Sequence, residues 1–418
     1  MAVLRQAASL GPLAQNWWTW PGSNDDLFDR FHAMQRERPL GLFSMRLENV
    51  SPLEEAGFVR DVREEAGLLE LTHARNRRGK HHARSISGTA EQQMNKSVPV
   101  YGSDDVQELL DYDGCIGIVR EAMACFTRDG IPQPLRNIFE IGPDRYFGTM
   151  PGMLAAPQGF GAKLLSVFED PKCPGRVPHR GAVVLFNRED GELVCIADAG
   201  EITKIRTAAA SAVATDILAR PDSARLAIFG CGAQAASHVR AITRIRKIEE
   251  VLIWGRSKAT ASQFADRIGE ETGIVVRAVH SPVEVAASAD IICTVTASPT
   301  PVLLGQWVRP GTHVNVVGSS RRGPVEVDHE LVIKSRYIAD SRLSALSAAS
   351  EFLSARDSGL VRDDHIVAEI GEVLLGRVPG RTSREEITLY KSLGHVVQDL
   401  AAAAYIHERA SRKQPARA

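Results

Sequence analysis

The sequence predicts an α/β protein whose central part is a parallel β-sheet with helices on both of its faces. From Ala224 onward, short apolar segments alternate with segments of helical periodicity. Such alternation is typical of a parallel sheet, because each pair of parallel strands needs a crossover connection. In residues 98–219, helical segments come first, strand-like segments follow and an alanine-rich helical segment ends this part.

Composition narrows the class of protein. The 418 residues are too many for one small domain, and 44% are hydrophobic, which is enough to fill real cores. A formal net charge of -1 gives no reason to expect nucleic acid or an anionic membrane as a partner. No run of about 18 apolar residues is present, and the N-terminus lacks the pattern of a secretory signal. The six scattered cysteines form no CxxC pair, so we expect a cytoplasmic protein with reduced thiols and no metal site.

We divide the chain into three parts. Residues 1–95 are expected to be a partly disordered N-terminal extension, and their basic run at 73–84 is interpreted as a solvated tail rather than a polyanion site. Residues 96–215 together with 392–412 are expected to form one domain. Residues 216–391 contain the strand–helix alternation and are expected to form the other.

The first domain is predicted to begin with helices. Short side chains at Ser103–Asp105 are typical of a helix start, and apolar residues recur at helical spacing from Ile116 to Phe126 until Gly130 ends that helix. Strands are predicted at 163–168, 181–187 and 193–198, the last two joined as a hairpin around Asp190-Gly191. An alanine-rich helix is predicted at 201–219.

In the second domain, strands are predicted at 225–229, 251–254, 275–277, 290–295, 313–317 and 337–339. Helical patterns lie between several of them. A last helix, about 392–409, is expected to return to the first domain and pack there.

A glycine pattern follows the first strand of the second domain. The run Leu226-Ala-Ile-Phe-Gly-Cys-Gly-Ala-Gln-Ala235 fits G-x-G-x-x-A, with Gly230 for the tight turn, Gly232 for close approach of a pyrophosphate and Ala235 for close packing of helix on strand. Ala233 and Gln234 begin the helix, whose free N–H groups favour phosphate. Because a strand precedes the glycines and a helix and strand follow, the run predicts a Rossmann-type dinucleotide site.

The end of the next strand indicates which cofactor is preferred. NAD-selective sites usually carry Asp or Glu there, whereas this chain has Arg256 with Ser257 beside it. A guanidinium suits a 2′-phosphate, so we predict that NADP(H) is preferred and that NAD(H) is possible. Thr294 and Thr296 follow the fourth strand and are expected to line the nicotinamide side. An exposed loop arginine and ordinary loop hydroxyls remain the alternatives.

Six motifs together resemble the ornithine cyclodeaminase/mu-crystallin family. They are Gly161-Ala-Lys163, Asp198-Ala-Gly-Glu-Ile-Thr-Lys-Ile-Arg-Thr-Ala-Ala-Ala210, Gly230-Cys-Gly-Ala-Gln-Ala235, Gly318-Ser-Ser-Arg321, Glu369-Ile-Gly-Glu372 and Lys391-Ser-Leu-Gly394. The resemblance covers about residues 98–409. It implies a discontinuous α+β substrate-binding and dimerisation domain beside the Rossmann-type domain, a homodimer, and substrates that are α-amino acids or their imines.

The resemblance also implies roles for single residues. Arg206 is the main clamp for a substrate carboxylate and Arg136 a second contact, which agrees with the bidentate pairing of guanidinium and carboxylate. Lys163 matches the active-site lysine, and a lysine confined near a cofactor can have a lowered pKa and pass protons. Thr207 and Gly394 are expected on the substrate side. Exposed arginines in surface ion pairs remain the alternative for the two guanidinium groups.

One motif departs from the cyclodeaminases. Those enzymes carry an Asp where Ser320 aligns, and serine cannot act as a base near neutral pH without an activating partner. We place Ser320 at the catalytic centre and Ser319 at the cofactor, and interpret Asp328 as part of a turn. Asp198 is a further candidate for the pocket.

These observations favour an NAD(P)H-dependent reductase of α-imino acids, such as pyrroline- or piperideine-2-carboxylate. A single reduction needs a clamped carboxylate, a positioned hydride and a proton, whereas cyclodeamination needs more proton transfers. The alternatives are ornithine cyclodeaminase, which forms proline and ammonia, an amino-acid or opine-type dehydrogenase, and a nucleotide-binding carrier without turnover.

Overall fold

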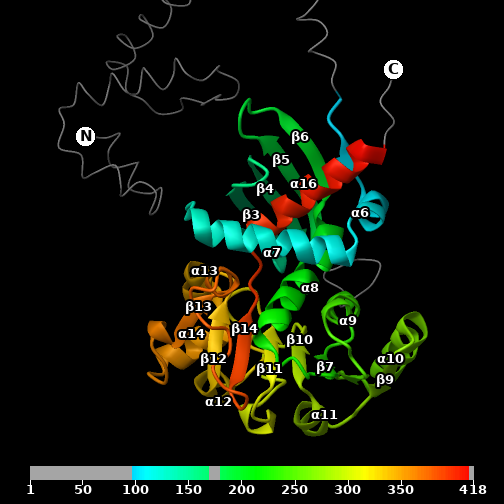
Figure 1. Ribbon diagram of the computed structural model, residues 1–418, viewed down its shortest axis with the longest axis vertical. Coiled ribbons are helices and arrows are strands. Elements are labelled where there is room, and N and C mark those ends of the chain that lie inside the picture. The colour runs from blue at the N-terminus through cyan, green and yellow to red at the C-terminus, as the bar shows by residue number, and fades with distance from the viewer. Residues whose placement is uncertain (1–96, 169–178, 414–418) are drawn as a thin grey trace, which may run out of the picture. The chain divides into compact units, whose positions relative to one another are not determined.

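The computed structural model describes residues 97–168 and 179–413, and these residues form two β-sheets with their helices (Figure 1). The expected N-terminal extension, with its basic run, lies outside the described residues. The five cysteines of the described part are free.

The first sheet has six strands in the order β1-β6-β5-β4-β3-β2. Their bounds are β1 Val100–Tyr101, β2 Asn137–Gly142, β3 Arg145–Leu154, β4 Gly159–Val167, β5 His179–Asn187 and β6 Leu193–Asp198. All pairs are antiparallel except β1 with β6. The predicted hairpin turn between β5 and β6 is confirmed, with Gly191 at a φ of 74° and its N–H bonded to the carbonyl of Asn187.

Three helices accompany this sheet: α6 Ser103–Leu109, α7 Tyr112–Asp129 and α16 Val396–Lys413. The predicted end of α7 is confirmed, because Gly130 takes the left-handed conformation that closes a helix. The C-terminal helix α16 packs against α7 and against β3 to β6 (Figure 1). Its predicted start at residue 392 is wrong by four residues, because a turn with Gly394 at a φ of 82° separates it from the preceding strand.

The second sheet has eight strands, all parallel, in the order β13-β12-β14-β11-β10-β7-β8-β9. Their bounds are β7 Arg225–Phe229, β8 Glu250–Trp254, β9 Val275–Ala278, β10 Ile291–Thr294, β11 His313–Val316, β12 Ser335–Ala339, β13 Ile366–Glu369 and β14 Ile387–Lys391. The helices are α9 Ala233–Ile245, α10 Lys258–Thr272, α11 Pro282–Ser288, α12 His329–Lys334, α13 Arg342–Ala348, α14 Ser350–Asp357 and α15 Ile370–Leu374, with short 3-10 turns at Gly305–Trp307 and Asp363–His365. Within the described ranges no helix is both long and apolar enough to cross a membrane.

The predicted fold class is confirmed by the way the parallel strands are buried. Along β7, Leu226 and Ile228 belong to one hydrophobic core, and Ala227 and Phe229 belong to another. Alternate side chains of a strand point to opposite faces, so both faces of this sheet are covered.

Strand β14 was not predicted, although it pairs with both β11 and β12 in the middle of the sheet. All five of its residues are buried. Because Thr388 and Lys391 are polar, the segment lacks the continuous apolar pattern that predicts a central strand. Thr388 is satisfied there by its bond to His313 at 3.0 Å.

Helix α8, Ala199–Leu218, follows the last strand of the first sheet and precedes the first strand of the second sheet in the chain. It contacts α7, α9 and β5. It begins two residues earlier than predicted, because the Asp198 carboxylate accepts a hydrogen bond from the Glu201 N–H at 2.7 Å and caps it. Its middle turns carry small buried side chains, which permit close helix packing. The helix presents Thr203, Arg206 and Thr207 near the first sheet.

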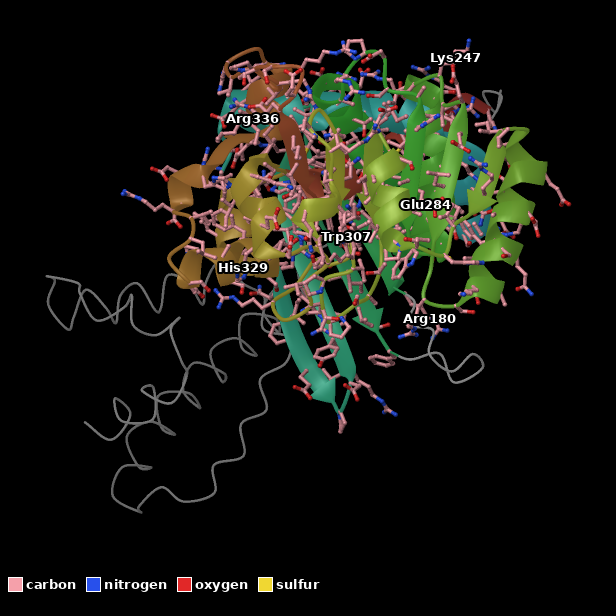
Figure 2. The ribbon with its side chains drawn as sticks, turned by 90° about the horizontal axis from the view of Figure 1, so that it is seen from below. Arg180, Lys247, Glu284, Trp307, His329 and Arg336 are labelled. Atoms are coloured by element: carbon pink, nitrogen blue, oxygen red, sulfur yellow. The ribbon has the colours of Figure 1, made fainter. Side chains whose placement is uncertain are left out.

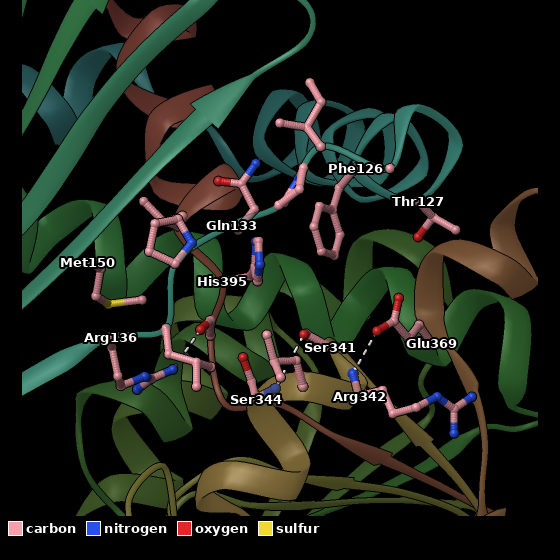
Figure 3. Close-up of a pocket in the computed structure, with 18 of the residues that line it drawn as sticks. Phe126, Thr127, Gln133, Arg136, Met150, Ser341, Arg342, Ser344, Glu369 and His395 are labelled. Atoms are coloured by element: carbon pink, nitrogen blue, oxygen red, sulfur yellow. Dashed lines mark hydrogen bonds between the residues drawn. The ribbon is translucent and has the colours of Figure 1, made fainter. Parts of the chain in front are cut away.

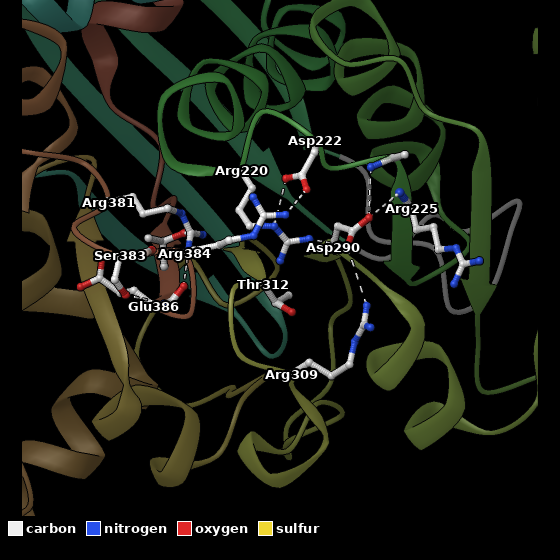
Figure 4. A network of polar contacts seen from close by, with 12 residues as sticks. Arg220, Asp222, Arg225, Asp290, Arg309, Thr312, Arg381, Ser383, Arg384 and Glu386 are labelled. Atoms are coloured by element: carbon white, nitrogen blue, oxygen red, sulfur yellow. Dashed lines mark hydrogen bonds and ion pairs between the residues drawn. The ribbon is translucent and has the colours of Figure 1, made fainter.

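An ionic network joins the loops at the amino ends of the parallel strands (Figure 4). Asp290, just before β10, accepts hydrogen bonds from the N–H groups of Ala224 and Arg225 at 3.0 Å and from Arg220 at 2.9 Å. Arg384, before β14, pairs with Asp222. These contacts stabilise the loops at the amino ends of the strands. Ligands of such sheets bind at the opposite, carboxyl ends of the strands.

Candidate active site

The glycine turn at the end of β7 has the geometry that a pyrophosphate requires. Gly230 has a φ of 130°, and a Cβ there would lie 3.0 Å from the carbonyl oxygen of Val295. A Cβ at Gly232 would meet no atom within 4 Å, so open space lies over the residue that precedes α9. No side chain caps this helix, whose first residue is Ala233. The turn therefore fits an anionic pyrophosphate at a helix N-terminus.

Gln234 connects this turn to helix α8. Its Nε2 donates to the carbonyl oxygen of Thr203 at 3.3 Å, while its Oε1 is buried and has no partner among the residues described. Ala235 is fully buried, as its role in close helix–strand packing requires. The glycine turn is thus fixed beside the helix that carries Arg206.

Arg256 and Ser257, which are predicted to select the cofactor, differ in whether their side chains already have partners in the protein. Arg256 is exposed after β8, and within the described part of the chain it makes no hydrogen bond or ion pair. The Ser257 hydroxyl accepts from the Thr260 N–H at 3.3 Å and caps α10. The guanidinium is therefore available to a ligand, whereas the hydroxyl already has a structural role.

Thr294 and Thr296 lie at the carboxyl end of β10, but their hydroxyls are already bonded to Glu326. The Thr294 hydroxyl donates to Glu326 at 2.9 Å and the Thr296 hydroxyl at 2.7 Å, and Glu326 also accepts from the N–H groups of Thr296 and Gly318 at 2.6 Å. Burial raises the pKa of Glu326, and the hydrogen bonds from Thr296 and Thr294 only partly oppose this rise. Glu326 was not predicted as a site residue. The one feature of the sequence that could have pointed to it is its position between two apolar residues, Val325 and Val327.

Ser319, predicted to contact the cofactor, instead turns its side chain into the protein. Its hydroxyl donates to the Glu351 carboxylate at 3.0 Å and accepts from Lys391 Nζ at 2.7 Å. Lys391 also donates to the Ser319 carbonyl oxygen and to Glu351, both at 2.6 Å. This buried ion pair holds the turn that carries Ser320.

Lys163 and Arg206 come together on one acidic residue. Lys163 on β4 is 1% exposed, and Arg206 on α8 is 5% exposed. Asp399 Oδ1, in the first turns of α16, accepts from Lys163 Nζ at 3.0 Å and from Arg206 Nε at 2.9 Å. Sequence analysis missed Asp399, because the expected start of the last helix did not place it at the site.

The protonation of Lys163 is shifted by its surroundings. Burial lowers the pKa of Lys163 to about 8, and the charge of Asp399 opposes that fall. The ammonium also donates to the hydroxyl of Thr203. A pKa near 8 lets Lys163 carry a proton at neutral pH and release it readily, as a proton donor must.

Arg136, in the loop before β2, reaches across to the nucleotide sheet. Its guanidinium donates to the carbonyl oxygens of Leu393 at 2.5 Å, Gly394 at 2.7 Å and Ser320 at 3.3 Å. Gly394 must be glycine here, because a Cβ would lie 2.7 Å from Arg206 Nη1. Arg136, Arg206, Gly394 and Ser320 therefore meet at one place.

Two further acidic residues, Asp340 and Asp328, accept hydrogen bonds from backbone N–H groups. Asp340, which sequence analysis missed, accepts from the N–H groups of Leu393 and Gly394 at 2.7 and 2.6 Å and fixes the turn after β14. Thr207 is buried in α8 next to Arg206. Asp328 caps α12 by accepting from the Leu331 N–H at 3.1 Å, which confirms that it belongs to a turn.

Arg136 also lines a cavity of about 470 Å³ (Figure 3). Its wall includes Met150, which is opposite Lys163 in the β3–β4 pair, and Gly394 and His395. Arg342 and Glu369 also line it, and the Glu369 carboxylate accepts a hydrogen bond from the Arg342 N–H at 2.7 Å. Lys163 and Arg206 are not part of this wall.

The chain is similar to known proteins over most of its length. Residues 98–414 match the model of the ornithine cyclodeaminase/mu-crystallin family. A ketimine reductase mu-crystallin from Mus musculus is 35% identical over 321 residues, 75% of this chain and 98% of the relative. A Delta(1)-pyrroline-2-carboxylate reductase from Bacillus cereus is 31% identical over 313 residues, 74% of this chain and 96% of the relative.

A solved structure also matches. Thermococcus litoralis Delta(1)-pyrroline-2-carboxylate reductase, in complex with NADH and L-proline, superposes with a TM-score of 0.72 at 30% sequence identity. The match covers 75% of this chain and 98% of that structure. The chain belongs to the ornithine cyclodeaminase/mu-crystallin family.

Proposed function

We propose that the protein reduces α-imino acids with a nicotinamide cofactor. The observation that carries this proposal is the junction of Arg206, Arg136 and Lys163 at the carboxyl edge of the parallel sheet, joined through Gln234 to the glycine turn. Two guanidinium groups suit the carboxylate of an α-imino acid. The relatives named as ketimine and pyrroline-2-carboxylate reductases support the same substrate class.

The residues of this chain would divide the work of one reduction. The glycine turn with Gly230 and Gly232 would hold NAD(P)H, which would supply the hydride for the imine carbon. Arg206 and Arg136 bind the carboxylate and orient the imine carbon, and Arg136 exchanges its backbone carbonyl partners for the substrate. Lys163 holds at Nζ the proton that passes to the imine nitrogen, so atoms and charge balance.

The first experiment measures NAD(P)H oxidation with pyrroline-2-carboxylate, piperideine-2-carboxylate and keto acids with amines, and product formation from ornithine with catalytic NAD⁺. We expect rapid reduction of a cyclic imine and little proline from ornithine. Ser320 supports this expectation, because its hydroxyl replaces the Asp that the cyclodeaminases carry. Ammonia and proline from ornithine at a comparable rate would favour the cyclodeaminase. Keto-acid and amine turnover would favour the opine-type dehydrogenase.

We further propose that NADP(H) is preferred over NAD(H), because the Arg256 guanidinium is unpaired after β8 and suits a 2′-phosphate. Replacing Arg256 by Asp should reduce the preference for NADPH over NADH by about 10- to 100-fold, since a hydrogen bond to a charged group contributes about 1.5–3 kcal/mol. The ratio of kcat/KM for the two cofactors measures this change. A wild-type protein that prefers NADH would refute the proposal.

A homodimer is proposed from the outer face of the six-stranded sheet. Phe139 on β2 is 52% exposed, and Phe160 on β4 stacks on Phe186 with ring centroids 5.2 Å apart. The strand register places Phe139 and Phe160 on the face opposite to Lys163. Helix α16 covers the opposite face, and strands of this sheet extend beyond the helices (Figure 2). We propose that a second copy of the chain covers this apolar surface.

Light scattering tests the homodimer. The wild type should have the mass of two chains, and Phe160→Glu with Phe139→Glu should shift it toward one chain, because buried charges oppose association. Exposed Leu343→Glu, on α13, is the matched control and should leave the mass unchanged. A wild-type monomer at micromolar concentration would contradict the proposal.

We also propose that the two sheets mark two domains, residues 96–215 with 392–412 for substrate binding and dimerisation, and residues 216–391 for the dinucleotide. Limited proteolysis with and without cofactor would test this division into two domains: cleavage should be suppressed by NADPH mainly within 216–391.

A cytoplasmic location is proposed as well, since free thiols are typical of a reducing compartment.

A further inference from the structure

Asp399 links the two cations on which substrate binding depends. Its side chain is fully buried in α16, and its Oδ1 alone holds both Lys163 Nζ and Arg206 Nε, at 3.0 and 2.9 Å. Its Oδ2 has no hydrogen-bond partner within the described ranges. Three separate elements, β4, α8 and α16, meet at this one oxygen atom.

The charges around Lys163 explain why an acid is needed at this place. Burial is the main cause that lowers the pKa of Lys163, and the positive charges of Arg206 and Arg136 lower it further. Asp399 is the anion among these groups, and the hydroxyl of Thr203 adds only a neutral partner. Burial alone would raise the pKa of Asp399, but Arg206 and Lys163 together hold it below its usual range. The carboxylate therefore stays charged and offsets the repulsion between the two cations.

A second contact fixes the direction of the Arg206 guanidinium. While Nε is bonded to Asp399, Nη1 donates to Gln398 Oε1 at 3.0 Å. The same guanidinium lies against the backbone of Gly394. Adjacent residues of α16 thus fix the guanidinium on one side, and an arginine held in this way loses little freedom when it binds a carboxylate.

We propose that Asp399 is a positioning residue of the active site: through Oδ1 it aligns the Lys163 ammonium with the Arg206 guanidinium and keeps Lys163 protonated for transfer to the imine nitrogen. Asp399 acts through Lys163 and Arg206 rather than on the substrate. The kinetic part of this inference rests on the proposed imine reduction, whereas the effect on Lys163 does not.

Asp399→Asn tests the inference, because it keeps the shape of the side chain and removes its charge. The ¹³Cε resonance of Lys163, in protein carrying ¹³C-labelled lysine and assigned by its loss in Lys163→Met, reports the protonation of the ammonium. In the wild type it should titrate near pH 8. In Asp399→Asn the midpoint should fall by about one pH unit or more, since an adjacent opposite charge shifts a pKa by one to three units.

The pH profile of kcat/KM for cyclic imine reduction gives the second measurement. Activity that needs protonated Lys163 is lost as the pH rises through its pKa, so this limb should move to lower pH in Asp399→Asn. Glu408→Gln removes a charge from an exposed position of the same helix, paired with Arg412, and should move neither the limb nor the resonance. A folded Asp399→Asn protein with unchanged titration and an unchanged limb would overturn the inference.

Asp399→Glu keeps the charge and moves the carboxylate by one methylene, and it also serves if Asp399→Asn does not fold. Lys163 should then titrate near its wild-type value, while the KM for the imine should rise at least tenfold because the two cations are displaced. An unchanged KM in this variant would overturn the inference. If the wild type reduces no imine, the proposed function fails, and the Lys163 titration still decides the role of Asp399.

Discussion

Replacement of Arg206 by methionine is expected to lower kcat/KM for an α-imino acid by roughly 10²- to 10³-fold, because truncating one partner of a buried charge pair removes about 2–5 kcal/mol of binding. Arg206 is 5% exposed, and its guanidinium is fixed by Asp399 and Gln398. The substrate carboxylate would therefore lose a donor that is already aligned. Steady-state kinetics with pyrroline-2-carboxylate measures the loss.

The control is Arg412→Met, which removes an exposed guanidinium from α16 and should leave kcat/KM within about twofold of the wild type. Methylguanidinium should restore part of the activity of a second variant, Arg206→Ala, because the small alanine side chain leaves the site of the guanidinium open. A merely misfolded variant would not be rescued. If Arg206→Met keeps wild-type kcat/KM, Arg206 does not bind the substrate carboxylate.

Arg206→Lys distinguishes charge from geometry at the same position. A lysine keeps the positive charge but cannot form two parallel bonds to a carboxylate or bind Asp399 and Gln398 together. We expect most of the loss to remain. Full activity in this variant would mean that charge alone is sufficient.

Local patterns were enough to predict six of the eight parallel strands. Strand β7 was predicted with its observed bounds, and five more parallel strands were predicted within two residues at each end. In β7, β8 and β10 the apolar residues are nearly continuous, so the pattern that predicts these strands is local. Strands β13 and β14 were not predicted. In β14, the buried polar residues Thr388 and Lys391 interrupt the apolar pattern.

Distance along the sequence explains what sequence analysis missed at the site. Lys163, Arg136 and Arg206 were predicted through motifs, and the structure brings them together. Asp399, which binds Lys163 and Arg206, and Asp340, which fixes the turn at Gly394, carry no local signal because their partners lie up to 236 residues away. A buried acid in a helix or at a strand end becomes recognisable only when the fold shows which cations and N–H groups face it.

Lys391 provides the second large expected effect, on stability. Both Lys391 and Glu351 are almost completely buried, and the ammonium donates to Glu351, to the Ser319 hydroxyl and to the Ser319 carbonyl oxygen. Lys391→Met would leave the Glu351 carboxylate buried and without its cation. We therefore expect a loss of about 3–5 kcal/mol in the free energy of unfolding, measured by urea denaturation.

The double variant Lys391→Met with Glu351→Gln separates the unpaired charge from the loss of packing. Glutamine is neutral and can still bond the Ser319 hydroxyl, so the double variant should be more stable than Lys391→Met alone by about 2 kcal/mol. If the double variant is the less stable of the two, an unpaired carboxylate is not the source of the loss. Because the same ammonium holds the turn that offers the Ser320 carbonyl oxygen to Arg136, the double variant should still show a raised KM for the imine. Restored stability with a raised KM would therefore show that this buried ion pair is retained to shape the substrate site, and wild-type KM in the double variant would assign it to stability alone.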